Sequence, residues 1–66
     1  MREQWTGELV GRMHNAQVTL DDLAAEMHCT KSYVSQILNG RRKPENAQER
    51  LENAFNSIVE RKNDEN

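Results

Sequence analysis

The chain has 66 residues, a formal net charge of −2 and one cysteine. A chain of this length buries only about 60% of the surface that it exposes when unfolded. It has only one Trp, one Tyr and one Phe for its core, so we do not expect a large catalytic cleft. No apolar run approaches the roughly 18 residues of a membrane span, the N-terminus has no signal-peptide apolar region, and a single cysteine fits a reducing compartment. We therefore expect a cytoplasmic protein with one domain over residues 1–62 and a disordered tail over residues 63–66.

The first predicted helix runs from residue 2 or 3 to about residue 15. Its large apolar side chains recur every four residues, at Trp5, Leu9 and Met13. Gly7 and Gly11 each weaken a helix by about 1 kcal/mol relative to Ala. Packing of the apolar stripe against other helices must therefore hold this helix in place.

The second predicted helix begins after Thr19. Thr19 and Asp22 have close to the spacing of a capping box, in which a hydroxyl and an acid satisfy free backbone amides. The apolar positions that follow share one helical face: Leu20, Leu23, Ala24 and Met27. Asp21 and Asp22 are interpreted as first-turn acids stabilised by the helix N-terminus. They do not suit a catalytic pair, because adjacent helical side chains diverge by about 100°.

The third predicted helix follows after a very short turn at His28 and Cys29. Thr30 is a second N-cap candidate, and Asn39-Gly40 ends the helix. Its apolar stripe consists of Val34, Ile37 and Leu38. Two short helices joined by so short a turn have helix-turn-helix geometry, in which the second helix can offer its polar face to base edges.

The fourth predicted helix covers residues 45–62. Pro44 precedes it and is favoured in a first turn. Its apolar positions fall within a sector of about 100°, with Val59 at the rim of that sector: Ala47, Leu51, Ala54, Phe55 and Ile58. The whole pattern predicts an all-α fold, a compact bundle of four to five short helices.

The positive charge is confined to the middle of the chain. Residues 28–44 contain no acid and have a net charge of +4, from Lys31, Arg41, Arg42 and Lys43. Residues 1–27 and 45–66 each have a net charge of −3. A field arranged in this way turns one side of a molecule toward phosphate, although four cations indicate weak binding by a monomer.

Residues 19–44 resemble the Xre/Cro family of phage and bacterial repressors. Ala24 stands where that family has a small residue between its two helices, and Cys29 stands at its buried turn position. The ending I-L-N-G-R-R-K-P is similar to the family's exit from the recognition helix. The resemblance implies a lambda-repressor-like fold that binds double-stranded DNA, with no cofactor and no small-molecule ligand expected.

Two positions depart from the family pattern. His28 stands where the family usually has Gly. That turn residue commonly has a positive φ, which costs a residue with a Cβ on the order of 1 kcal/mol. Leu20 stands where the family often has a phosphate-contacting Gln. We therefore expect a slightly strained turn and no phosphate contact from residue 20.

Four residues of the third helix are predicted to contact bases: Lys31, Ser32, Tyr33 and Gln36. The first residues of a recognition helix reach the floor of the major groove. Lys31 can donate to guanine and Gln36 can pair with adenine, whereas Ser32 is compatible with several bases. Tyr33 is equally consistent with a partly buried side chain.

A second set is predicted to contact phosphates: Thr19, Thr30, Ser35, Asn39, Arg41, Arg42 and Lys43. Arg41, Arg42 and Lys43 are charges on a mobile loop, which fix register on DNA without reading sequence. The two threonines are N-caps first, and Asn39 is equally consistent with a helix C-cap.

His14, His28 and Cys29 do not form a predicted metal site. No fourth ligand has the spacing of a zinc site, and Cys29 matches a core position. The sequence also contains no Ser-His-acid or Cys-His arrangement and no glycine-rich phosphate loop. We expect neither a metal nor an enzymatic activity.

The resulting hypothesis is a sequence-specific transcriptional regulator, a repressor that excludes polymerase from a promoter. The main alternative is a protein-binding module on the same helices, such as a phage-encoded inhibitor or adaptor, which the overall charge of −2 favours. An antitoxin has a suitable size but usually carries an additional C-terminal segment. A weak homodimer on two half-sites is expected, with Phe55 and Val59 at its interface.

Overall fold

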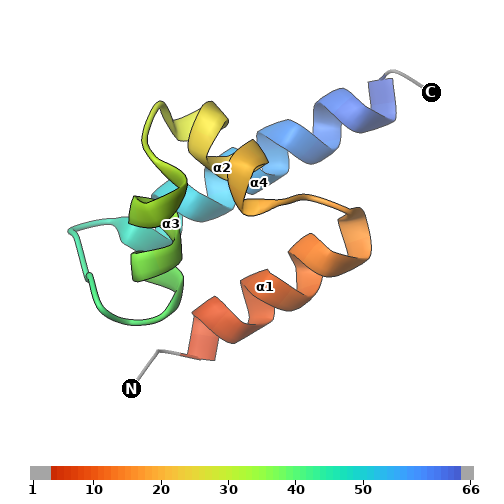
Figure 1. Ribbon diagram of the computed structural model, residues 1–66. Helices are drawn as coiled ribbons and strands as arrows, with labels where there is room; N and C mark the ends of the chain where they lie inside the picture. Colours follow the sequence, from red (N-terminus) through yellow and green to blue (C-terminus); the bar gives the residue numbers. More distant parts are fainter. Residues whose placement is uncertain (1–3, 65–66) are drawn as a thin grey trace.

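The computed structural model describes residues 4–64, which form four α-helices and no strand (Figure 1). The helices are α1 (Gln4–Ala16), α2 (Leu20–Met27), α3 (Lys31–Leu38) and α4 (Ala47–Asp64). Helix α2 packs against both α3 and α4, and α1 packs against α4 and α3. The predicted all-α bundle is confirmed, with four helices in the described part of the chain.

The N-terminus of α2 forms the predicted capping box. The backbone N–H of Asp22 donates to Thr19 Oγ1 at 3.1 Å, and the backbone N–H of Thr19 donates to Asp22 Oδ2 at 2.9 Å. This second bond lowers the pKa of the Asp22 carboxyl, because it favours the ionised form. The start of α2 is therefore fixed by residues within one turn of each other.

The turn between α2 and α3 depends on a left-handed residue. His28 has φ 57° and ψ 44° and caps the C-terminus of α2, as expected from the resemblance, since the family that the sequence resembles usually has Gly at this position. The backbone N–H of Cys29 donates to the Ala24 carbonyl at 3.0 Å. Thr30 then caps α3 by accepting from the Tyr33 backbone N–H at 3.1 Å. Cys29 itself is only partly buried and packs at the edge of the core.

The core lies between the four helices. Its buried apolar side chains come from every helix and from the α1–α2 connection: Leu9, Met13, Val18, Leu23, Ala24, Val34, Ile37, Leu38, Leu51, Ala54, Phe55 and Ile58. Trp5, predicted as a core residue, is only half-buried, whereas Thr6 beside it is 2% exposed. Leu9 and Met13 confirm the rest of the predicted α1 stripe.

Two helix boundaries differ from the prediction. Helix α4 begins at Ala47 and not at residue 45, because Asn46 has φ 63°, which an α-helix cannot accommodate. Helix α4 also continues through Asn63 and Asp64, which the sequence assigned to a disordered tail. The rest of that tail and the predicted start of the first helix at residues 2–3 lie outside the described residues.

Long-range polar contacts hold α4 to the remainder of the bundle. Arg61 Nη2 lies 2.6 Å from Glu26 Oε1 on α2, and the hydrogen bond lowers the pKa of Glu26. Lys62 Nζ donates to the Gln17 carbonyl at 2.9 Å, just beyond α1. None of the described helices is long and apolar enough to cross a membrane.

Candidate DNA-binding face

Helix α3 is anchored by one side and polar on the other. Val34, Ile37 and Leu38 are buried in the core, where α3 packs against α2 and α1. The remaining positions form what we call the outward face of α3: Lys31, Ser32, Tyr33, Ser35, Gln36 and the C-cap Asn39. Lys31, Ser32 and Asn39 are exposed, and the other three are half-buried. A helix held in this way can present polar groups to a groove without moving its backbone.

Side chains on the outward face are linked to each other along the helix. Gln36 Nε2 donates to Ser32 Oγ at 3.4 Å, and Asn39 Nδ2 donates to Ser35 Oγ at 3.3 Å. Both pairs are four residues apart, the spacing at which helical side chains meet. The bonds are long and exposed, so DNA can replace them at little cost.

Lys31, a predicted base reader, has an acidic neighbour on α2. Its ammonium lies 3.8 Å from the Asp21 carboxylate, and both side chains are mostly exposed. Solvent-exposed pairs of this kind contribute at most about 1 kcal/mol. Lys31 can therefore leave Asp21 for a base or a phosphate.

The α3–α4 connection begins with a basic loop, which we define as Arg41, Arg42 and Lys43. All three are exposed. The backbone N–H groups of Arg41 and Arg42 donate to the Gln36 carbonyl at 2.9 and 3.2 Å, and Gly40 supplies the required φ of 82°. The loop therefore folds back against the C-terminus of α3.

Arg42 contacts two predicted base readers. Its Nε donates to Gln36 Oε1, and its guanidinium carbon lies 5.4 Å from the centre of the Tyr33 ring. The sequence analysis placed Arg42 on a mobile loop as a phosphate ligand and did not connect it with Gln36. No spacing rule signals this contact, because it crosses the end of α3 and depends on the path of the loop.

The two N-cap threonines lie at helix starts on the exposed surface. Thr19 and Thr30 each accept a backbone N–H through Oγ1, which leaves the hydroxyl proton available for donation. The free N–H groups and the dipole of a helix N-terminus also favour an anion. Both threonines can therefore combine capping with a phosphate contact.

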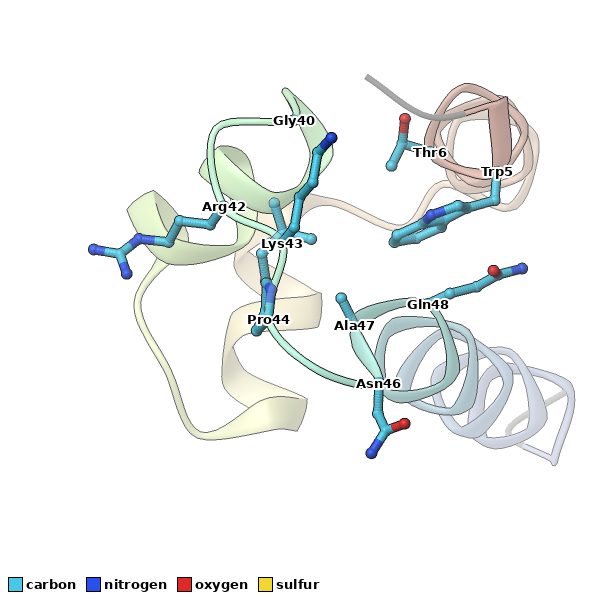
Figure 2. Close-up of a pocket in the computed structure, with 10 residues that line it drawn as sticks. Trp5, Thr6, Gly40, Arg42, Lys43, Pro44, Asn46, Ala47 and Gln48 are labelled. Carbon is cyan, nitrogen blue, oxygen red and sulfur yellow. The ribbon is translucent and has the colours of Figure 1, made fainter. Parts of the chain in front are cut away.

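A cavity of about 250 Å³ lies behind the basic loop, between the start of α1 and the start of α4 (Figure 2). Trp5, Lys43, Ala47 and Gln48 are among its lining residues. Figure 2 shows the Arg42 side chain directed away from Trp5. Sequence reasoning treated Trp5 as a core residue and so missed this cavity. Arg42 and Lys43 of the basic loop both line the cavity, and the Arg42 guanidinium lies over the Tyr33 ring of α3.

Of the two residues predicted at the dimer interface, Phe55 is buried in the core. Its side chain is 5% exposed, and the Arg12 guanidinium covers it at 4.9 Å from the ring centre. Val59 is half-buried at the edge of the core. The large hydrophobic side chain that is exposed in the described residues is Val10 on α1, at 38%, which the sequence analysis did not single out.

His14, His28 and Cys29 lie at two separate places in the fold. Over residues 4–64, no three His, Cys, Asp or Glu side chains gather closely enough to hold a metal ion. His14 is in the last turn of α1, whereas His28 and Cys29 belong to the α2–α3 turn.

Comparison with known protein families agrees with this geometry. The family described as "Helix-turn-helix domain" matches residues 7–56. That span contains α2, α3, the basic loop and most of α1. No curated protein and no solved structure matches the chain. The chain therefore belongs to the helix-turn-helix domain family and has its DNA-binding architecture.

Proposed function

We propose that this protein is a sequence-specific transcriptional regulator of the Xre/Cro type that represses by occupying a promoter. The observation that carries this proposal is the outward face of α3. It is polar, contains no acid and adjoins the basic loop, while the opposite side of the same helix is buried in the core. Recognition helices dock in the major groove with such a face.

The charge distribution supports the same orientation. Lys31 and the three cations of the basic loop are all exposed, with Lys31 on the outward face of α3 and the basic loop at the C-terminal end of that helix. The acidic residues belong to the other segments, with Asp21 at the near edge. A surface with one basic side steers a protein toward phosphate even when its net charge is negative.

Different residues serve affinity and sequence reading in this proposal. Base edges are read from α3, by Lys31, Ser32, Tyr33 and Gln36. Phosphates are bound by hydroxyl, amide and cationic groups around it: Thr19, Thr30, Ser35, Asn39, Arg41, Arg42 and Lys43. Hydrogen bonds to phosphate fix the register, and hydrogen bonds to bases give specificity.

The protein acts as a weak homodimer on two half-sites about 34 Å apart. One helix-turn-helix unit reads few base pairs, so a second unit is needed for selectivity. Val10 on α1 is exposed and Val59 on α4 is half-buried, which makes both candidates for the interface. Val59→Glu should reduce two-site cooperativity and leave the single-site affinity unchanged, as measured by footprinting. Unchanged cooperativity would remove Val59 from the interface, and Val10→Glu is the matched variant.

Selection of bound DNA from a random oligonucleotide pool tests the function. The expected result is an enriched sequence with two similar half-sites.

Affinity for the selected sequence should fall with salt on a log–log slope of about −5 to −7, because a dimer neutralises roughly six to eight phosphate charges. Arg41→Ala should reduce the slope by about 1 per subunit. Arg50→Ala, which removes a cation from α4, is the control.

A protein-binding module is the second candidate. The exposed surface of the C-terminal segment favours it, since Glu45, Glu49, Glu60 and Asp64 are all exposed there. In that case the selection returns no enriched sequence, and the binding of DNA is weak and uniform across sequences.

A further inference from the structure

Arg42, Tyr33 and Gln36 form a connected group at the edge of the outward face of α3. Arg42 Nε donates to Gln36 Oε1, and the Arg42 guanidinium lies 5.4 Å from the Tyr33 ring centre. Each partner is fixed in turn. Tyr33 sits in the first turn of α3, where its N–H is held by Thr30, and the Gln36 carbonyl accepts the Arg42 backbone N–H.

This arrangement leaves a defined part of the guanidinium for DNA. Arginine has five N–H donors, one on Nε and four on the two Nη atoms. The Nε donor is occupied by Gln36, so the Nη atoms remain as an end-on pair. Such a pair matches O6 and N7 of guanine, which is the commonest specific contact in the major groove.

The contacts with Tyr33 and Gln36 also restrict the side chain before DNA arrives. A free arginine loses rotamer entropy when it is ordered. Stacking on an aromatic ring is favourable for a guanidinium, so part of that ordering is already present in the unbound protein. A pre-organised donor pair discriminates between bases more sharply than a mobile charge does.

We propose that Arg42 is a specificity-determining residue that binds a guanine of the operator, and that Tyr33 and Gln36 are its positioning residues. This inference rests on the proposed function and changes two roles within it. Arg42 reads a base and is not a phosphate ligand. Gln36 orients Arg42 and does not read an adenine, because a bidentate pair with adenine needs its Oε1, which Arg42 engages.

The central experiment compares Arg42→Lys with Arg41→Lys in the full chain. Both variants keep the charge and remove the planar donor pair. Arg41 is the adjacent exposed cation of the same loop. Binding is measured to the half-site selected by the wild type and to every single-base variant of it. Arg42→Lys should lower the discrimination at one guanine by roughly 5- to 150-fold, while Arg41→Lys preserves the discrimination at every position.

Two further pairs of variants test the positioning roles. Tyr33→Phe keeps the ring under Arg42, whereas Tyr33→Leu removes it. Gln36→Glu keeps an acceptor for Arg42 Nε, whereas Gln36→Met is of similar size and has none. Tyr33→Leu and Gln36→Met should each weaken discrimination at the same guanine as Arg42→Lys, and the two conservative variants should retain it. Circular dichroism and thermal unfolding identify any variant that is not folded.

The outcomes separate this inference from the proposed function. If the wild type selects no sequence, the proposed function fails and the role of Arg42 fails with it. If a sequence is selected but Arg42→Lys and Arg41→Lys weaken all variants of the site alike, Arg42 binds phosphate and this inference alone is overturned. If Gln36→Glu changes the preference at an adenine, Gln36 is a base reader and the positioning role is wrong.

Discussion

The α2–turn–α3 unit and the α1–α4 pair are held by different kinds of interaction. Both short helices of the unit start at an N-cap threonine whose side chain satisfies a backbone N–H three residues later. In the pair, by contrast, α1 contains two exposed glycines and is held by contacts with distant residues such as Phe55 and Lys62. The recognition unit is therefore specified locally, whereas the supporting helices depend on packing.

The largest loss of stability should come from Leu51→Ala, which should unfold both regions. Leu51 of α4 is completely buried, and α4 packs against both α1 and α2. Loss of a buried leucine costs about 2–5 kcal/mol, a large share of the stability of a small domain. We expect both regions to unfold together when thermal denaturation is followed by circular dichroism. Val59→Ala, at a half-buried position, is the control. If α2 and α3 remained helical after α1 and α4 had unfolded, the two regions would not unfold cooperatively.

Thr19→Ala should destabilise the recognition unit by about 1 kcal/mol. It removes the acceptor for the Asp22 N–H and disrupts the capping box. Thr19→Ser keeps the hydroxyl and should be close to the wild type. Urea denaturation gives the two free energies of unfolding, and equal values for Ala and Ser would show that the box contributes nothing.

Gly7→Ala and Gly11→Ala should each stabilise the protein by about 0.4–1 kcal/mol. A Cβ at either position meets no atom within 4 Å, so the gain in helix propensity is not offset by a clash. The contrasting variant is Gly40→Ala in the basic loop, which should destabilise because Gly40 has φ 82°. Differential scanning calorimetry measures the shifts. A loss of stability at residue 7 or 11 would indicate a hidden constraint on α1.

The smallest effect concerns pH and the capping box. The Thr19 N–H lowers the pKa of Asp22 in the folded state. The unfolded chain therefore binds this proton more readily, so the contribution of Asp22 to stability is complete above its ordinary pKa of 3.8 and is lost as the pH falls through the lower folded value. In Asp22→Asn, the free energy of unfolding should decline less steeply with falling pH than in the wild type. Asp21→Asn is the control, because it keeps the capping box and should decline as the wild type does. An identical decline in the wild type and Asp22→Asn would refute the role of this carboxylate.

Features that depend on neighbouring residues could be predicted from the sequence. The Thr19–Asp22 capping box and the apolar stripe of α3 were both predicted and are confirmed, and the left-handed turn at His28 was expected from the family resemblance. Each depends on backbone or side-chain groups within about one helical turn, so the printed order of residues contains the necessary information. The concentration of positive charge between residues 28 and 44 is likewise a property of the sequence alone.

The tertiary structure decided the features that depend on the path of the chain. Helix α4 starts at Ala47 because Asn46 adopts a left-handed conformation, and Phe55 is covered because α1 brings Arg12 over its ring. Arg42 meets Tyr33 and Gln36 only because the basic loop folds back over the end of α3. These contacts follow from the packing angles of the helices and the closure of a loop, and no local periodicity reports either quantity.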